Sequence, residues 1–450
     1  MTTDALCRLP AIDLLELLRA KECSAREVAQ SCLARIGELE PVIHAFVEID
    51  AEGALRTASA LDNRDFSGPL HGVPIAVKET IDVAGLKCTL GSPIHGSRKP
   101  SSDSPVVRRL REAGAIIVGT TVSTEYAIAR AGPTTNPHDA TRTPGGSSSG
   151  SAASVAAGMV PISIGTQTVG SIIRPAAYCG IFGLKPTKQA ISTAGAMPLS
   201  SYLDHIGPMA RIASDTLLAF HAMADTESGH RLRTTPVVTP KRVLRIEGLL
   251  QKYVEPSSRE AVDKAQALLE SQGIRVGTAK LSARFENVVS CYETILFRDI
   301  ASNHGRDRDR HGSAMSVRLR EIIDSGRKIS DNAYAGAIAD ARAYREEILE
   351  LLEADSVILA PATNGTAPAF SEETGPSRLQ GPWSLVGLPV LAVPCGSVDG
   401  LPVGVQFIAL PQREDLLGGT GAFFRAEWPD EHGDAPVLTN HATSRSRPQS

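Results

Sequence analysis

Apolar residues in the first part of the chain recur at helical spacing. Between Ile12 and Leu18 they fall on one helical face, which predicts an opening helix that buries this face. The run Ser24-Ala25-Arg26-Glu27 follows. Its serine and glutamate are spaced as in a capping box, which closes the first turn of a helix. A second helix is therefore predicted to begin at Ser24.

Further along, helical spacing alternates with short apolar runs. A helix is predicted from Ser104-Pro105 to Glu112, because serine caps a helix and proline fits its first turn. Gly114 ends this helix, and the apolar run 115–118 is typical of a buried strand. The same order recurs in the Ala-rich run 151–158 and the run 161–165. This alternation predicts an α/β fold, with a single large mixed β-sheet covered by helices on both faces.

The middle of the chain is richer in charge. The runs 257–271 and 333–352 have amphipathic helical spacing, and 355–361 returns to a buried strand. Five regions follow from these changes: an N-terminal helical region (1–68), a core (69–225), a more variable, largely helical lobe (226–354), a return to the core sheet (355–440) and a disordered tail (441–450).

Composition argues against several classes of partner. A net charge of −4 offers no basic surface for nucleic acid or for a membrane. No apolar run reaches the roughly 20 residues that a membrane helix needs, and no basic flank of a signal peptide is present. Seven scattered cysteines indicate reduced thiols, so a cytoplasmic location is expected.

Two Gly-Ser steps carry the candidate chemistry. Gly146-Ser147 and Gly170-Ser171 lie in one stretch, and a glycine before a serine leaves room for a substrate to approach the hydroxyl. A serine hydroxyl is a poor nucleophile without a base. Lys78 ends the apolar run 75–77, and burial there would lower the pKa of this lysine enough for it to accept a proton.

These groups suffice for acyl transfer. One serine attacks a carbonyl carbon, and the second relays its proton to the lysine. The oxygen that becomes negative needs hydrogen-bond donors. The oxyanion hole is predicted to consist of the backbone N–H groups of Thr168, Val169, Gly170 and Ser171. Such chemistry requires no metal and no cofactor, and none is predicted.

The ordered blocks of residues around these serines resemble the amidase signature family. The blocks are 145–148, 165–171 and 179–187, with further similarity at 387–389 and 401–406. The resemblance implies the amidase signature fold, with 69–225 as its core, and the hydrolysis of a carboxamide C–N bond. It implies that Ser171 is the nucleophile, that Ser147 follows a cis peptide bond, and that Lys78 is the base.

The arginine after the nucleophile is similar to that of the malonamidase subgroup. Most family members have an arginine two residues after the nucleophile, whereas Arg174 is at the third position. In the subgroup this arginine holds the free carboxylate of the substrate, which fits the rigid fork of a guanidinium. Further substrate-binding residues implied by the resemblance are Gly146, Ser148 and Thr166. Related enzymes often form homodimers, so a homodimer is also expected.

The turn before the nucleophile departs from the common pattern. Many family members have Asp and Gly where this chain has Gln167 and Val169. If the turn required a positive φ at Val169, the backbone would be strained, because a β-branched side chain disfavours that conformation.

Other interpretations stay open. The serine-rich loop before a helix also fits a non-hydrolytic protein that binds an anion or a nucleotide. Residues 146–150 match a nucleophile elbow centred on Ser148, but the elbow needs a preceding strand and the residues before it are typical of a loop. Within the family, an acyl transferase or an amidotransferase subunit remains an alternative. Arg174 could instead hold nearby backbone carbonyls.

The remaining polar groups are assigned ordinary roles. His205 and His221 are expected to be polar or half-buried groups, Cys179 to be a packing residue and 306–310 to be a solvated charged run. The sequence thus predicts an amidase that cleaves a small, carboxylate-bearing, malonamate-like amide through a serine acyl-enzyme. Its partner would be this small-molecule substrate.

Overall fold

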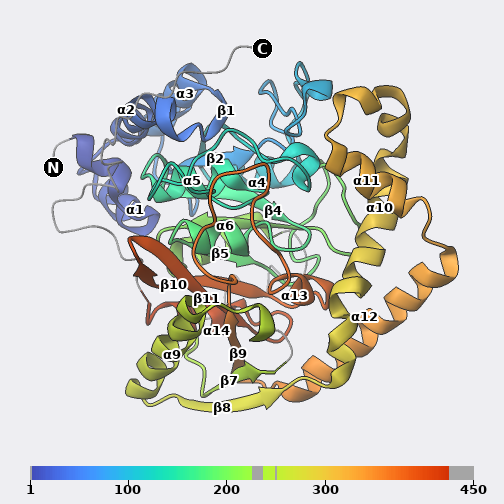
Figure 1. Cartoon of the computed structure of the whole chain (residues 1–450). Helices are drawn as coiled ribbons and strands as arrows, with labels where there is room; N and C mark the ends of the chain where they lie inside the picture. Colours follow the sequence, from blue (N-terminus) through green and yellow to red (C-terminus); the bar gives the residue numbers. More distant parts are fainter. Residues whose placement is uncertain (1–2, 225–236, 249–250, 425–450) are drawn as a thin grey trace.

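A single β-sheet runs through the molecule. The computed structural model describes residues 3–224, 237–248 and 251–424. Within them the strands are β1 (Phe46–Ile49), β2 (Pro74–Lys78), β3 (Ile116–Thr121), β4 (Ile162–Gln167), β5 (Phe182–Lys185), β6 (His205–Ala210), β7 (Arg242–Glu247), β8 (Arg275–Lys280), β9 (Ser356–Pro361), β10 (Val390–Val398) and β11 (Leu401–Ile408). They form an 11-stranded sheet in the order β1-β3-β2-β4-β6-β5-β10-β11-β9-β7-β8 (Figure 1).

The sheet is mixed, as predicted. Strands β3, β2 and β4 are parallel neighbours at one end, and β9, β7 and β8 are parallel at the other. The strands between them pair antiparallel. Parallel strands need covered faces and long crossover connections, which the helices supply.

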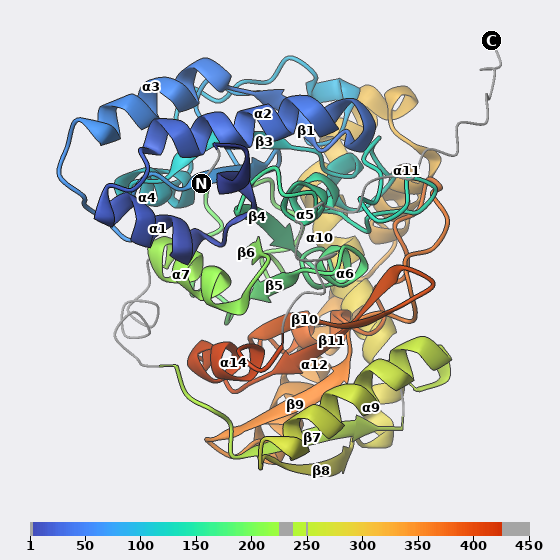
Figure 2. The same ribbon diagram turned by 90° about the vertical axis from the view of Figure 1, so that its left-hand side faces the viewer.

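Helices cover both faces of this sheet. They are α1 (Ala11–Ala20), α2 (Ala25–Ile43), α3 (Ala51–Asp62), α4 (Pro105–Glu112), α5 (Ser149–Ala156), α6 (Ile173–Tyr178), α7 (Ala213–Met223), α9 (Pro256–Ser271), α10 (Val288–His311), α11 (Val317–Gly326), α12 (Asp331–Leu351), α13 (Gly381–Leu385) and α14 (Glu414–Gly421). Short 3-10 helices lie at Thr3–Arg8, Pro93–His95, Glu125–Ala127, Gln251–Tyr253, Ala283–Asn287 and Gly312–Ala314. Figure 2 shows α2 and α3 together above the sheet.

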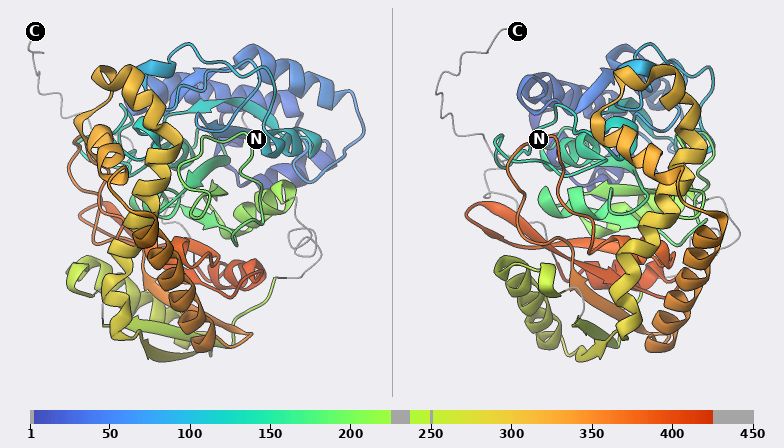
Figure 3. Two further views of the ribbon diagram at one scale, coloured as in Figure 1. Left: turned by 90° about the vertical axis from the view of Figure 1, so that its right-hand side faces the viewer. Right: turned by 45° about the vertical axis from the view of Figure 1, so that its right-hand side comes forward.

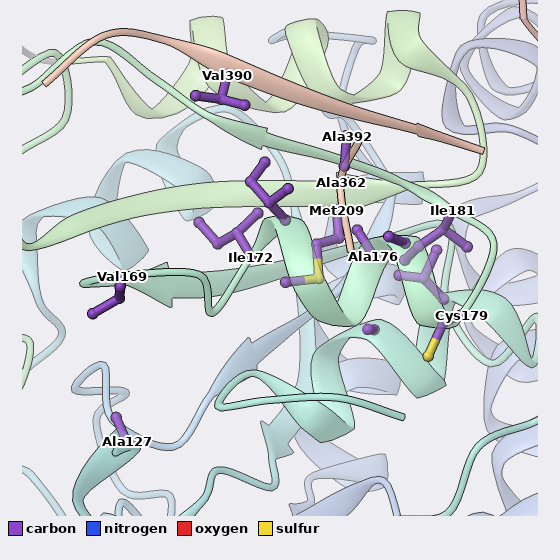
Figure 4. Close-up of a cluster of buried hydrophobic side chains, with 14 of the residues drawn as sticks. Ala127, Val169, Ile172, Ala176, Cys179, Ile181, Met209, Ala362, Val390 and Ala392 are labelled. Carbon is purple, nitrogen blue, oxygen red and sulfur yellow. The ribbon is translucent and has the colours of Figure 1, made fainter. Parts of the chain in front are cut away.

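The hydrophobic core is divided by the sheet. Successive residues of β10 alternate between the two sides: Val390 and Ala392 belong to the cluster that includes residues of α5 and α6, whereas Leu391 and Val393 belong to the cluster that includes residues of α7, α9 and α14. Figure 4 shows part of the first side, where Ile172 lies in the same cluster as Val390 and Ala392. Both faces are therefore buried.

The locally coded elements are confirmed. The helix predicted at Ser24 is α2, and its capping box is complete: the Ser24 hydroxyl accepts from the Glu27 N–H at 3.1 Å, and the Glu27 carboxylate accepts from the Ser24 N–H at 2.8 Å. Ser104 caps α4 as predicted. Residues 151–156 of the Ala-rich run 151–158 lie in α5, and the strand after it is β4.

Two regions differ from the sequence-based description. The N-terminal region 1–68, predicted to be helical, also contains β1, a four-residue edge strand that pairs antiparallel with β3. In the described part of the lobe predicted at 226–354 as largely helical, β7 and β8 also extend the main sheet beyond β9. Its helices α10, α11 and α12 pack together on one side of the molecule, which Figure 3 brings forward. The tail predicted at 441–450 lies outside the described residues.

Other global expectations concern thiols and membranes. All seven cysteines lie in the described ranges, and none forms a disulfide. Among the described helices, none has the length and apolar character needed to cross a bilayer.

Substitution of Ser24 tests the capping assignment. Ser24→Ala removes the acceptor for the Glu27 N–H and should lower the free energy of unfolding by about 1 kcal/mol. Urea denaturation followed by far-UV circular dichroism measures this change. Ser24→Thr keeps a hydroxyl and is the matched control, with an expected loss of only a few tenths of a kcal/mol. Equal losses in the two variants would contradict the cap.

Candidate active site

Lys78 is enclosed at the carboxyl end of β2. Its Nζ atom lies 2.8 Å from Ser147 Oγ and 2.8 Å from Thr166 Oγ1, and the side chain is fully buried. Strands β2 and β4 are parallel, with Val77 opposite Ile164, so Lys78 and Thr166 emerge at the same edge of the sheet. The crevice beyond the carboxyl ends of parallel strands is where α/β folds commonly place their sites.

The serine-rich run before and within α5 is tightly packed. The Ser148 hydroxyl donates to the Thr166 carbonyl at 3.1 Å, and Ser151 donates to the Ile164 carbonyl at 3.2 Å. At Gly150 a Cβ atom would lie only 2.1 Å from the Ala45 carbonyl oxygen, so no larger residue fits there. The run is thus held by hydrogen bonds to β4 and by close packing at Gly150, and it is not a flexible loop.

Ser147 and Ser171 face one cavity from different segments. The Gly146–Ser147 peptide bond is cis, as the resemblance implied, and Ser147 follows it at the cavity wall. Ser171 lies on the turn between β4 and α6 and lines the same cavity. Within the described ranges the Ser171 hydroxyl forms no hydrogen bond, so it is available to a ligand in the cavity.

The turn from Thr168 to Ser171 presents unused donors. The four backbone N–H groups of this turn donate to no acceptor in the part of the chain that the structure describes. All four residues line the cavity although each is buried. Buried N–H groups are rarely left without an acceptor, so this arrangement is suited to an anionic oxygen that arrives with a ligand. Val169 does not have a positive φ, so the strain considered from the sequence is absent.

The Lys78 ammonium is disfavoured by its surroundings. Burial, assisted by the nearby Arg174 cation, lowers the pKa of Lys78 to about 7. Glu79 and Asp204 act in the opposite direction without cancelling the effect of burial. Near neutral pH a large fraction of Lys78 is therefore a neutral amine that can accept a proton.

Arg174 is buried beside the same cavity and bound to backbone carbonyls. Its Nε and Nη2 atoms donate to the Gly146 carbonyl at 3.0 and 2.6 Å. Nη1 donates to the Gly375 carbonyl at 2.5 Å, and Nη2 also reaches the Thr374 hydroxyl at 3.2 Å. One Nη1 hydrogen remains, and no carboxylate in the described ranges lies within 4 Å of the guanidinium.

The cavity has a volume of about 650 Å³. Its lining comes from the serine segments and from elements distant in sequence, namely Thr124, Ala127–Arg130, Ser147, Thr168–Ser171, Arg174, Tyr292, Glu293, Leu296, Phe297, Met315–Arg318, Arg320, Ile322 and Glu372–Arg378. Three residues predicted to bind substrate are absent from this lining: Gly146, Ser148 and Thr166. They contact Arg174, β4 and Lys78 respectively, and so lie behind the cavity wall.

Several contacts of the turn were not anticipated from sequence. The Thr168 hydroxyl donates to Asp204 at 2.7 Å, and burial raises the pKa of Asp204 to about 6. The side-chain amide oxygen of Gln167 (Oε1) accepts from the backbone N–H groups of Ile172 and Ile173 at 2.8 and 3.0 Å. The departure at Gln167 was visible in the sequence, but its partners depend on the fold.

The minor alternatives can now be placed. Ser148 is fully buried, and no strand lies between Glu125–Ala127 and α5 in this described segment, so the requirements of a nucleophile elbow are not met. His205 is buried in β6 with Nδ1 near the Leu203 carbonyl, away from the cavity lining. Cys179 is buried in the core. The charged run 306–310 forms the end of α10.

Comparison with known proteins identifies the class. Residues 27–417 match the family model described as Amidase. A glutamyl-tRNA(Gln) amidotransferase subunit of Symbiobacterium thermophilum is 35% identical, covering 90% of this chain and 93% of that protein. AtzE, a 1-carboxybiuret hydrolase subunit of a Pseudomonas species, is 33% identical, with 91% and 96% covered. The solved peptide amidase of Stenotrophomonas maltophilia has a TM-score of 0.79 and 28% identity, with 92% and 96% covered.

The chain belongs to the amidase family. It is an amidase, an enzyme that hydrolyses carboxamide bonds, and its mixed sheet with helices on both faces is the fold of its solved relatives.

The depressed pKa of Lys78 predicts a pH-dependent stability difference. Between pH 7 and about 10, the unfolded chain holds a proton on Lys78 that the folded chain has lost, so folding of the wild type becomes more favourable as pH rises. Lys78→Met lacks this group. The variant should be the more stable protein at pH 7, and its advantage should shrink by up to about 1.4 kcal/mol per pH unit toward pH 9.

Urea unfolding of both proteins at pH 7, 8 and 9 measures this difference. Ile164→Val is the control, because it alters the neighbouring core without removing a titratable group, so its effect should be constant with pH. A constant difference for Lys78→Met as well would rule out the depressed pKa.

Proposed function

We propose that this amidase works through a serine acyl-enzyme in which Ser171 is the nucleophile, Ser147 the proton relay and Lys78 the base. The observation that carries this proposal is the placement of Lys78 Nζ 2.8 Å from Ser147 Oγ, with Ser171 on the wall of the same cavity. A buried lysine with a pKa of about 7 supplies the base that a serine hydroxyl lacks.

The first half of the reaction transfers one proton and forms one bond. Ser171 Oγ attacks the amide carbon while its proton passes to Ser147, whose own proton passes to Lys78. This relay requires the Ser171 hydroxyl to rotate toward Ser147. The carbonyl oxygen becomes negative and accepts hydrogen bonds from the free N–H groups of Thr168 to Ser171.

The second half returns the enzyme to its starting state. The proton on Lys78 goes back through Ser147 to the leaving nitrogen, and the C–N bond breaks to release ammonia or an amine. Water then attacks the acyl-enzyme by the same route, and the acid product leaves. None of these steps requires a metal or a cofactor.

Replacement of the proposed nucleophile tests this mechanism. Ser171→Ala should reduce ammonia release from malonamate by roughly 10⁴-fold or more, because no acyl-enzyme can form. Ser154→Ala is the matched control: this serine is also buried, it donates to the Ser151 carbonyl in α5, and its replacement should leave the rate near that of the wild type. Unimpaired hydrolysis by Ser171→Ala would refute the nucleophile assignment.

For the substrate, we propose a small amide that carries a carboxylate, with malonamate as the leading example. Arg174 supports this choice, because it is a buried cation at the cavity wall without a carboxylate partner in the described ranges. A buried charge is costly unless it is paired, so a substrate carboxylate would supply the missing counter-charge. The bonds from Arg174 to Gly146 and Gly375 leave only one Nη1 hydrogen, so the contact would be a single charge-assisted hydrogen bond.

Matched substrates separate this role of Arg174 from a structural one. Malonamate and isovaleramide have similar shapes, but only malonamate is an anion. Arg174→Leu should raise the KM for malonamate by about 10- to 100-fold, the value of one hydrogen bond to a charged group, with a much smaller change for isovaleramide. Arg174→Lys keeps the charge and should retain most of the preference. Equal effects on both substrates would leave Arg174 as a residue that only holds carbonyls.

The second candidate function is that of an amidotransferase component. The similarity to one subunit of a glutamyl-tRNA(Gln) amidotransferase and to one subunit of a hydrolase favours a chain that acts with other proteins. Such a component should be inert alone and gain activity only with partners. Ammonia release by the purified chain separates the two functions, and sedimentation of the same sample tests the expected homodimer.

A further inference from the structure

Two backbone carbonyl groups of the turn from Thr168 to Ser171, here called the oxyanion turn, accept hydrogen bonds from residues outside it. The Val169 carbonyl accepts a hydrogen bond from the Ser384 hydroxyl at 3.1 Å. The Gly170 carbonyl accepts from the Arg174 N–H at 2.9 Å. In a planar trans peptide, the C=O and the next N–H point in opposite directions. The N–H groups of Gly170 and Ser171 are therefore directed away from these partners, and both residues line the cavity.

Gln167 determines which way the Ser384 hydroxyl points. The Gln167 Nε2 atom donates to Ser384 Oγ at 3.0 Å. The other end of the same side-chain amide, Oε1, accepts from the backbone N–H groups of Ile172 and Ile173. These two backbone donors fix the orientation of the amide. A hydroxyl has a single proton, so Ser384, having accepted from Gln167, donates to the Val169 carbonyl. The three groups form one directed chain from amide to hydroxyl to carbonyl.

This chain is buried and makes contact with the core. Gln167 is 1% exposed and Ser384 is fully buried, so water does not compete for their hydrogen bonds. Helix α13, which carries Ser384, also packs against the turn: a Cβ atom at Gly381 would lie 2.7 Å from Val169 Cγ1. Glutamine is suited to this position because it both accepts and donates, whereas a carboxylate only accepts.

We infer that Gln167 and Ser384 are positioning residues for the oxyanion hole, which orient the peptide between Val169 and Gly170 so that its N–H points at the reacting oxygen. This inference rests on the proposed function, in which Ser171 is the nucleophile. The two residues touch neither substrate nor nucleophile, and they act through the Val169 carbonyl.

A fluorophosphonate probe tests the inference without knowledge of the substrate. Ser171 Oγ would form a bond to phosphorus as the P–F bond breaks and fluoride leaves, while the serine proton passes through Ser147 to Lys78. The phosphoryl oxygen then occupies the oxyanion hole. Intact mass spectrometry at several probe concentrations gives the maximal labelling rate (kinact) and the reversible binding constant (KI).

Two single variants disturb the chain in different ways. Ser384→Ala removes the donor to the Val169 carbonyl. Gln167→Glu has the same shape but offers no N–H, so Ser384 would donate to the new carboxylate and no longer to Val169. Each should lower kinact by about 10- to 100-fold, somewhat less than the loss of an oxyanion donor, and leave KI nearly unchanged. Ser384→Ala should also keep the pH midpoint of kinact, because Lys78 is untouched.

The double variant and two controls distinguish positioning from general packing. Both residues act through one hydrogen bond, so their effects should not add. The kinact of the double variant should therefore lie within about twofold of the kinact of the slower single variant. Ser163→Ala and Gln406→Glu are matched controls, since each is buried and donates only to backbone carbonyls outside residues 168–171, Ser163 to Ala76 and Gln406 to Pro361 and Leu379. Their kinact should stay within about twofold of the wild type.

The outcomes separate this inference from the proposed function. Labelling of the wild type at Ser171 with unchanged kinact in folded Ser384→Ala and Gln167→Glu would overturn the inference and leave the nucleophile intact. Equal losses in the two controls would overturn it as well, in favour of a general packing effect. A wild-type protein that is not labelled at Ser171 would refute the proposed mechanism and the inference with it.

Discussion

The enclosure of Lys78 is the constraint on which the rest of the site depends. An ammonium group taken out of water loses hydration free energy, and hydroxyl neighbours do not restore it. Lys78 has the hydroxyls of Ser147 and Thr166 at 2.8 Å and, within the described ranges, no carboxylate within 4 Å. Its pKa therefore falls to about 7. This environment exists only because β2 and α5 are both buried and closely packed.

A second buried cation reinforces the first. Arg174 lowers the pKa of Lys78 through space and, at the same time, ties the Gly146 carbonyl to the segment that contains Thr374 and Gly375. The same guanidinium thus holds the cavity wall and keeps positive charge beside the cavity. In the proposed reaction, a carboxylate on the substrate would balance this charge, while the base remains neutral enough to accept a proton.

The cavity wall is built from two different parts of the fold. The serine segments and Lys78 lie at the carboxyl ends of β2 and β4, whereas the opposite wall comes from α10, the segment at Met315–Ile322 and the segment Glu372–Arg378. Relatives named for different activities are 28 to 35% identical to this chain. Because the proposed base is held by a strand of the sheet, the rest of the wall can differ between relatives without disturbing it.

Local signals in the sequence predicted many of the elements and the candidate reacting residues. The caps at Ser24 and Ser104 act within one helical turn, and the glycine before each serine acts on its own neighbours, so these features were readable from spacing. Edge strand β1 was not, because a four-residue strand carries little pattern and exists through pairing with β3. Strands β7 and β8 likewise join the sheet through pairing that residue spacing does not encode.

Tertiary structure alone decided what surrounds the reacting groups. Arg174 meets Thr374 across 200 positions of sequence, and Ser384 meets Val169 across 215. These long-range contacts decide how many N–H groups of Arg174 remain free. They also decide which side chain donates to the Val169 carbonyl in the turn from Thr168 to Ser171. Sequence by itself determined which residues are candidates for the chemistry, because their signals are local. The burial and hydrogen bonding that set the state of each residue arise only when distant segments pack together.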